Sequence, residues 1–580
     1  MKEFRLKIFP KDWIKAYSVL KKLTNLSNYK FLLIITIMML VTFLEAFSLT
    51  LVLPLLELIK DQKNLISNDN NFLTDGIVFF FNYIGFPVKF VYLSTLIATV
   101  VFLRQYFNFS LNKMLANIRA NSNKALRKNI FESTFLSAPN SIEGLGNGSY
   151  VELMTNQSNY ASGFVVHLIR YLSILLLSLF YFFISCSISF VITLIAIVLA
   201  VFLMMFANII ISKIKNISKK NVINLKHFSK YLSECFSSWK VIKLSNSYNY
   251  ENSRNENWIS KIAEQEYQRE YNSAKSVFFI SIIVMIFLII SLNIGVNIGN
   301  IELGMLVMFS IMCLRLLPLM LVLVSIKTRI TISSESLSRL FEVLNDLNLN
   351  KEIDLGKKRL SMQNGIKFEN ITFKYPDAKK YIFKNFNCFI RFGDVTTISG
   401  SSGSGKSTLL DLLSRMYNTY RGKITIDKIT IKKIGLIDYR SNISLLPQNP
   451  FIYDDTVKSN ISYGYKRLRE DDIIKAAKLA NAHDFIVKLS KGYNTILGER
   501  GSKISGGQVQ RIVLARILAS KAKVIILDEP TSSLDYTSSK KIINALKKIK
   551  KIGKYTLIIA SHNEEIINLG DNIIQLHALD

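Results

Sequence analysis

Residues 400–407 form a glycine-rich segment, Gly-Ser-Ser-Gly-Ser-Gly-Lys-Ser, whose residue types and spacing could hold phosphate. It fits the pattern G-x-x-x-x-G-K-[ST] and lies between a strand-like run at 395–399 and a helix-like run at 408–416. Its backbone N–H groups can surround phosphate oxygens at the start of a helix, while Lys406 neutralises the β- and γ-phosphates and Ser407 ligates Mg²⁺. The segment predicts a site for a nucleoside triphosphate.

Two adjacent acids follow a second buried strand. Residues 524–527 are aliphatic, and Asp528 and Glu529 come directly after them. Asp528 is placed to hold Mg²⁺ through water, and Glu529 can act as general base on an attacking water or orient it. A solvated strand edge would also carry acids, but the aliphatic run and the glycine-rich segment together favour a hydrolytic site.

The sequence Ile-Ser-Gly-Gly-Gln at residues 504–508 lies between these two segments and resembles the signature sequence of the ATP-binding cassette (ABC) family. Other motifs of that family follow in the expected order. The resemblance implies that Tyr375 stacks on adenine and that Gln448 contacts metal and water. It also implies that Asp535 belongs to the loop after the catalytic acid and that His562 is a switch histidine that contacts the γ-phosphate.

The resemblance implies ATP and Mg²⁺ as ligands and assigns three groups of residues. The expected catalytic residues are Glu529, His562 and Gln448. The expected metal-binding residues are Ser407, Gln448 and Asp528. The expected nucleotide-binding residues are Tyr375, Gly400, Ser401, Gly403, Ser404, Gly405, Lys406, Ser407, Thr408, Ser505, Gly506, Gly507, Gln508 and Asp535.

The resemblance also implies a dimer. In this family the signature serine and glycines offer hydroxyl and backbone N–H donors to the γ-phosphate held by the opposite cassette. This chain has one glycine-rich phosphate segment and one signature, so it cannot close a site alone. Because Glu529, His562 and the signature are intact, a symmetric homodimer is expected, with a heterodimer as the alternative.

Lysine and arginine number 73 against 42 aspartates and glutamates, which gives a formal net charge of +31. In a soluble chain this excess would indicate nucleic-acid binding, but in a membrane protein basic residues collect in cytoplasmic loops and beside anionic lipid. Long apolar runs favour the second interpretation, so no nucleic-acid partner is expected. The four cysteines lie too far apart for a metal site or a disulfide framework.

Six apolar runs are each long enough to cross a hydrocarbon core, which takes about 20 residues. They lie at residues 31–59, at 90–107, in a pair within 163–211 that turns at 185–189, at 276–294 and at 303–326. Basic residues concentrate before the first span, at 113–128 and at 213–243, so both termini are expected on the cytoplasmic side of the membrane.

Three regions are expected. Residues 1–30 form an amphipathic cytoplasmic or interfacial segment, and residues 31–349 form a six-helix transmembrane domain in which 111–163 and 213–275 continue as long cytoplasmic helices. Residues 72–84 could add a short external helix. Residues 350–580 form a nucleotide-binding domain of the α/β P-loop NTPase class. This fold class, an α-helical membrane domain plus an α/β domain, resembles a type I ABC exporter (type IV ABC transporter) half.

The membrane-spanning runs contain ionisable residues, which are costly there and tend to face a cavity or a partner. They are Glu45, Arg104, His167, Arg170 and Arg315. Each could fix helix packing through an ion pair or contact a transported substrate. Arginines inside a cavity would suit phosphate or pyrophosphate, which they bind through paired hydrogen bonds.

Residues 43–56 and 314–318 are similar to PglK-type flippases of lipid-linked oligosaccharides. This resemblance implies that the chain turns a polyprenyl-pyrophosphate-linked glycan across the bacterial inner membrane, with Arg315, Arg104 and Glu45 as candidate substrate contacts. Other lipid flippases, multidrug exporters and peptide exporters share the same layout. An ATP-gated channel or regulator is a further alternative, but the intact Glu529 favours active transport by alternating access.

Overall fold

The computed structural model describes residues 28–52, 89–139, 146–188, 227–297, 303–352, 356–376, 378–418, 420–465, 468–532 and 534–577, together with isolated positions between them. The chain divides into two compact units, Met1–Lys351 and Glu352–Asp580.

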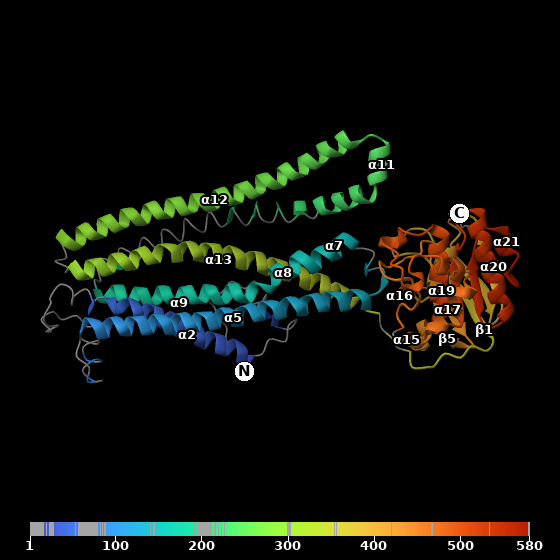
Figure 1. Ribbon diagram of the computed structural model, residues 1–580, viewed down its shortest axis with the longest axis horizontal. Helices are drawn as coiled ribbons and strands as arrows, with labels where there is room; N and C mark the ends of the chain where they lie inside the picture. The colour runs from blue at the N-terminus through green and yellow to red at the C-terminus, as the bar shows by residue number, and fades with distance from the viewer. Residues whose placement is uncertain are drawn as a thin grey trace. The chain divides into compact units, whose positions relative to one another are not determined.

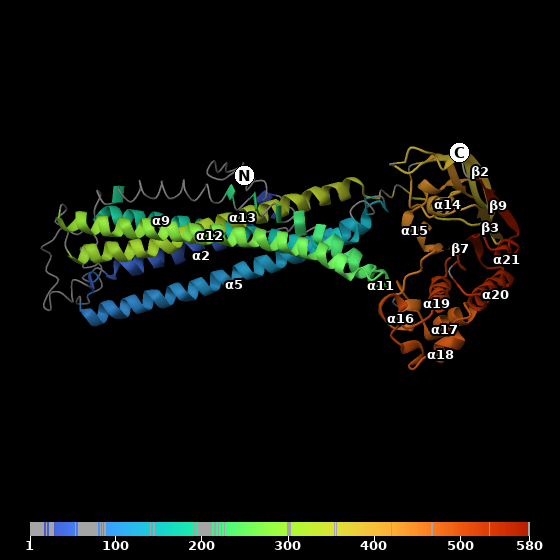
Figure 2. The same cartoon turned by 90° about the horizontal axis from the view of Figure 1, so that it is seen from above.

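The first unit is helical. Its long helices are α2 (Asn28–Thr50), α5 (Phe90–Leu136), α9 (Phe164–Ile188), α12 (Tyr248–Asn297) and α13 (Leu303–Leu349). Shorter pieces are α7 (Asn147–Glu152), the π-helical turn η1 (Leu153–Gln157), α8 (Ser158–Ser162) and α11 (Trp239–Leu244). Helices α5, α9 and α13 run lengthwise beside one another, α2 packs on α5 and α9, and α12 packs on α13 (Figures 1 and 2).

Within the part of the chain that the structure describes, three stretches are long and apolar enough to cross a membrane: Tyr29–Thr50, Phe90–Leu136 and Gly148–Ser187. Helices α12 and α13 include the predicted fifth and sixth spans. The fourth predicted span, after residue 188, lies almost entirely outside the described residues, as do residues 1–16 and nearly all of the predicted external helix at 72–84. The count of six spans therefore stays a prediction.

The turn predicted at residues 185–189 is wrong at its start, because α9 continues as helix through Ile188. Polar residues indicated a turn here, but the Ser187 hydroxyl donates to the Ile184 carbonyl at 2.8 Å. A serine that bonds to the preceding turn of its own helix needs no water, so it can remain in an apolar helix.

The long helices exceed the thickness of a membrane. Helix α5 has 47 residues, which corresponds to about 70 Å of helix against a hydrocarbon core of about 30 Å. The continuous helix predicted over residues 111–163 is wrong, however, because α5 ends at Leu136. Ser137 forms a bridge with Lys351, residues 139, 141 and 142 are helical, and α7 begins at Asn147 after Gly146, whose φ is +71°. That backbone conformation favours glycine and interrupts the helix.

The second unit contains two sheets. A parallel sheet has the strand order β6 (Ile443–Leu446), β7 (Val524–Asp528), β8 (Thr556–Ala560), β3 (Val395–Gly400) and β9 (Asn572–Leu576). An antiparallel sheet has the order β2 (Phe383–Arg391), β1 (Gly365–Phe373), β4 (Arg421–Ile426) and β5 (Ile429–Thr430). Strand β8 is buried along its whole length, as expected of a parallel sheet covered on both faces.

Helices of the second unit belong to two apolar cores. One core includes β1, β2 and α14 (Lys406–Leu413), and the other includes α17 (Glu470–Leu479), α19 (Gly506–Ala519) and α20 (Tyr536–Ile552). Strands β7 and β8 alternate their side chains between these cores, because neighbouring residues of a strand face opposite ways. The other α-helices that the structure describes in this unit are α15 (Leu436–Ser441), α16 (Val457–Ile461), α18 (His483–Val487) and α21 (Glu564–Ile567).

A bidentate ion pair joins Glu352, the first residue of the second unit, to Arg440 of α15. The Arg440 Nη1 and Nη2 atoms of α15 donate to the two carboxylate oxygens of Glu352 at 2.8 and 2.7 Å. The Glu352 side chain is only 14% exposed. Bidentate geometry and partial burial make such a pair stronger than an ordinary surface pair.

Replacing Glu352 by Gln is therefore expected to lower the free energy of unfolding by about 1–2 kcal/mol, because a charge-assisted pair is lost and Arg440 keeps its charge. Thermal unfolding of the full chain in detergent, followed by circular dichroism, measures the change. The matched control is Glu369→Gln, which removes an exposed partner of Lys367 and should leave the melting temperature unchanged. Equal effects of the two variants would contradict the assigned role.

Candidate functional site

The predicted nucleotide-site residues of the second unit lie close together at the carboxyl ends of the parallel strands. Asp528, the last residue of β7, is paired with Ala560 at the end of β8, and Ile398 near the end of β3 is paired with the same Ala560. The chain that follows each strand therefore leaves the sheet along one edge. In open parallel sheets this edge is where ligands bind.

The segment after β3 is a loop that opens onto the amino terminus of α14. Gly403 and Gly405 have φ values of +80° and +95°, and a Cβ at Gly405 would lie 2.7 Å from Ile382 Cγ2. The Lys406 Nζ donates to the carbonyls of Gly400 and Ser401 at 2.9 and 3.0 Å. The buried Ser404 hydroxyl has no hydrogen-bond partner. The loop thus offers donors and a helix amino terminus to an anion.

Asp528 and Ser407 provide the oxygens that a magnesium ion would need. The Ser407 hydroxyl bonds to the Asp528 carboxylate, and burial raises the pKa of that carboxyl above its ordinary value. The other oxygen, Asp528 Oδ1, is buried without a hydrogen-bond partner. A buried, unsatisfied carboxylate oxygen beside a hydroxyl fits a hard cation that prefers oxygen ligands.

Glu529 lies between two basic groups. Its Oε1 atom is 4.0 Å from Lys406 Nζ, and its Oε2 atom is 2.8 Å from His562 Nδ1. The Glu529 side chain is 11% exposed and the His562 side chain 70% exposed. Glu529 also has a φ of +47°, a conformation that residues with side chains rarely adopt. The geometry holds this carboxylate at the sheet edge, where it can accept a proton from a water molecule.

The remaining predicted nucleotide contacts lie around this edge. Gln448 follows β6 and is exposed. Tyr375 is half-buried, and its hydroxyl lies 3.1 Å from the Thr408 hydroxyl of α14. Its ring also packs edge-on against Tyr417, with 5.2 Å between ring centroids. The sequence did not indicate Tyr417 as a neighbour of the site. Its place there comes from packing against Tyr375, which is distant in the chain.

The signature begins α19. Ser505 caps this helix in a capping box with Gln508, in which Ser505 N donates to Gln508 Oε1 at 2.9 Å. A Cβ at Gly507 would lie 2.6 Å from Ser538 Cβ of α20, so this glycine permits close helix packing. Ser505 and Gly506 are exposed. The start of α19 thus presents donors to solvent.

Asp535 has a local structural role. Its side chain caps α20, accepting from Ser538 N at 3.0 Å and from the Thr537 hydroxyl. These hydrogen bonds hold the pKa of the Asp535 carboxyl well below its ordinary range. The observed bonds account for an aspartate at this position without a nucleotide.

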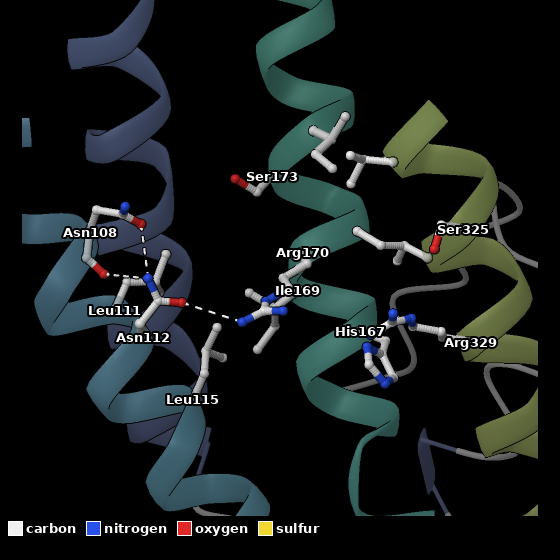
Figure 3. A pocket seen from close by; sticks show the side chains of 13 residues that line it. Asn108, Leu111, Asn112, Leu115, His167, Ile169, Arg170, Ser173, Ser325 and Arg329 are labelled. Atoms are coloured by element: carbon white, nitrogen blue, oxygen red, sulfur yellow. Dashed lines mark hydrogen bonds between the residues drawn. The ribbon is translucent and has the colours of Figure 1, made fainter. Parts of the chain in front are cut away.

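The three candidate substrate residues of the first unit form an ion-pair cluster. Glu45 of α2 lies 3.0 Å from Arg104 of α5 and 3.9 Å from Arg315 of α13. One carboxylate thus joins three helices. The other two ionisable residues of the predicted spans, His167 and Arg170, lie elsewhere, at a cavity between α5, α9 and α13 (Figure 3).

Sequence reasoning missed a third basic residue at that cavity, Arg329. It lies three residues beyond the end of the predicted sixth span, and therefore outside the apolar runs in which an ionisable residue stands out. A signal was present, because Arg329 follows Ile326 at helical spacing and continues the same face.

Comparisons with known proteins identify the second unit. Residues 383–532 match the family model described as ABC transporter. Over 211 residues the chain is 44% identical to an ATP-dependent lipid A-core flippase of Syntrophus aciditrophicus (strain SB), covering 36% of this chain and 34% of that protein. Over 220 residues it is 40% identical to the multidrug resistance protein pgp-1 of Caenorhabditis elegans, covering 38% and 16%. The match thus spans about a third or less of these relatives.

The architecture of the whole chain is similar to that of a solved structure, a bacterial Atm1-family ABC exporter with ATP bound. The TM-score is 0.76, and the comparison covers 95% of this chain and 93% of that chain at 19% sequence identity. At this identity the likeness concerns the fold. The chain is therefore a multi-pass membrane protein with the fold of an ABC exporter half-transporter, and its second unit carries the ATP-binding domain of the ABC transporter family.

Proposed function

We propose that this chain hydrolyses ATP to move a substrate across a membrane, as one half of a homodimer that works by alternating access. The observation that carries the proposal is the meeting of Lys406, Asp528, Glu529 and His562 at one sheet edge. A phosphate-binding lysine, a metal-binding acid and a candidate general base are the parts that phosphoryl transfer to water requires.

Each residue has a distinct chemical part. Lys406 and the amino terminus of α14 bind the β- and γ-phosphates, and Tyr375 lies beside the same helix to support the base. Ser407, Asp528 and Gln448 would hold Mg²⁺, which when bound neutralises charge on the phosphate oxygens. Glu529 accepts the proton of the attacking water, and His562 orients Glu529 through their 2.8 Å contact.

In the proposed homodimer, the start of α19 in one copy faces the phosphate loop of the other copy. Ser505 and Gly506 at the start of α19 bind the γ-phosphate on the phosphate loop of the partner copy. ATP then binds between two copies, and its hydrolysis releases them. The long helices convey this closure to a membrane unit that alternates between two conformations.

For the substrate we propose a polyprenyl-pyrophosphate-linked oligosaccharide or a related lipid. Support comes from the similarity of residues 43–56 and 314–318 to PglK-type flippases and from the relatives described as lipid A-core flippases. We further propose a bacterial inner membrane, both termini on its cytoplasmic side, and domains at residues 31–349 and 350–580 after an interfacial segment at 1–30.

Replacing Glu529 by Gln is expected to reduce ATP hydrolysis by at least about 100-fold, because the general base is lost, while ATP binding is retained. Phosphate release and equilibrium binding of labelled ATP measure the two properties on the same preparation. Glu470→Gln, on an exposed side chain, is the matched control and should hydrolyse normally. A Glu529→Gln chain with normal turnover would contradict the assigned role.

A complementation experiment tests the shared site. Gly506→Glu places an acid at the start of α19, where a Cβ would meet Leu534 Cδ2 at an ordinary 3.7 Å, so the variant should fold. Gly506→Glu alone and Lys406→Ala alone should each be inactive. A mixed dimer of the two keeps one intact site, so co-assembled chains should recover about a quarter of the normal rate if assembly is random. No recovery in a verified mixed dimer would contradict the arrangement.

The raised pKa of Asp528 predicts a pH-dependent stability. The folded chain binds this proton more tightly than the unfolded chain, so stability without nucleotide falls as pH rises from the ordinary Asp value through the raised value. Asp528→Asn removes this cost and should melt roughly 1–4 °C higher at neutral pH, with a difference that shrinks in acid.

The same variant should lose the rise in melting temperature that Mg²⁺ and ATP give the unaltered chain. Calorimetry with and without Mg²⁺ and ATP measures both effects, and Asp454→Asn, at an exposed position, is the control. An Asp528→Asn chain that is less stable at neutral pH without nucleotide would refute the predicted sign.

A further inference from the structure

Three aromatic rings of the second unit pack together beside α14. Tyr375, in the loop after β1, lies nearly perpendicular to Phe373 and to Tyr417, with 5.3 and 5.2 Å between ring centroids. Phe373 and Tyr417 also pack on each other, with 5.8 Å between their centroids. Rings in such arrangements attract each other, because the edge of a ring is positive and its face is negative. Each of the three rings therefore helps to hold the other two.

Tyr375 depends on side-chain contacts more than its two aromatic neighbours do. Phe373 is the last residue of β1, where it is paired with Phe383 of β2, and it is almost completely buried. Tyr417 is also buried. Tyr375 belongs to no strand and is only half-buried, so the backbone hydrogen bonds of the sheet do not fix its side chain. Its ring contacts Phe373 and Tyr417, and its hydroxyl contacts Thr408.

Tyr417 joins this ring to the helix that begins at the phosphate loop. The hydroxyl of Thr408, in the first turn of α14, lies 3.1 Å from the Tyr375 hydroxyl. Tyr417 follows the other end of α14, in a segment that is hydrogen-bonded back to this helix, since Met416 N donates to the Asp411 carbonyl at 3.0 Å. The helix and the segment after it therefore hold Tyr375 at two points, its hydroxyl and its ring.

We infer that Tyr417 is a positioning residue of the nucleotide site, because its ring holds the ring of Tyr375 in the orientation that stacks on the base. The inference rests on the proposed function for the view that Tyr375 stacks on the base of ATP. An aromatic ring that is fixed before the ligand arrives binds more tightly than a mobile ring, since less conformational freedom is lost on binding. Loss of the Tyr417 ring should therefore weaken the binding of a base and leave the binding of phosphates unchanged.

The test compares two ligands of the full chain in detergent with Mg²⁺. One is the β,γ-imido analogue of ATP, which is not hydrolysed, and the other is inorganic tripolyphosphate, which has no base; calorimetry measures both dissociation constants. Tyr417→Leu, which removes the ring, should weaken analogue binding at least about fivefold and change tripolyphosphate binding less than about twofold. Tyr417→Met is a second ring-free variant with the same expected result. Tyr417→Phe, which keeps the ring, should bind both ligands within about twofold of the unaltered chain.

A double variant tests whether Tyr417 acts through Tyr375. Tyr375→Leu should weaken analogue binding at least as much as Tyr417→Leu does. The chain with both substitutions should bind the analogue no more weakly than Tyr375→Leu alone, because the effects of residues in contact do not add. The matched control is Tyr420→Leu, at another buried aromatic of the same apolar core, whose ring lies 4.3 Å from Lys432 Nζ. This control should change neither dissociation constant.

Three results would each overturn the inference. Normal analogue binding by a folded ring-free variant would show that Tyr375 needs no support from Tyr417. An equal loss of both ligands would show that the substitution loosens the whole site, and additive losses in the double variant would show that Tyr417 acts without Tyr375. A chain that binds both ligands as expected but does not hydrolyse ATP would contradict the proposed function and still support the role of Tyr417.

Discussion

The negative charge of a nucleotide's phosphates is the constraint on which the arrangement of the second unit depends. Surrounding that charge takes many N–H donors, and one helix amino terminus supplies only part of them. The phosphate loop directs Lys406 and the start of α14 toward the sheet edge, whereas Ser505 and Gly506 at the start of α19 are exposed. In the proposed dimer each copy supplies the donors that the other copy lacks, so nucleotide binding and association become one event.

Compensation of charge also distinguishes two regions of the first unit. Glu45 lies beside Arg104 and Arg315, so these arginines have a carboxylate partner and join three helices. Arg170 and Arg329 line a cavity with no acidic residue among its described lining. A charge inside a helical bundle is tolerated when it is paired or when it serves a ligand. The first region therefore fits a structural tie, whereas Arg170 and Arg329 are exposed in this structure.

The residues of the nucleotide site could be named from the sequence because they stand in short contiguous motifs at strand ends. Parallel strands that end at one edge bring such motifs together whatever the rest of the chain does. The helical unit was harder to predict, since its details depend on contacts between distant residues. Ser187 bonds within its own helix and so gives no turn, and the pairing of Glu45 with Arg104 requires two helices to pack. The end of α5 at Leu136 was missed for a different reason, because the glycine that breaks the pattern, Gly146, lies ten residues further on.

The most direct test of the central claim is the ATP hydrolysis rate per chain when the chain is reconstituted in lipid nanodiscs that hold either one copy or two. If nucleotide is hydrolysed between two copies, discs with two copies should turn over ATP and discs with one copy should show almost no hydrolysis, although they still bind ATP. Equal rates per chain in the two kinds of disc would contradict the shared site, and with it the proposed route by which nucleotide closure drives the membrane helices.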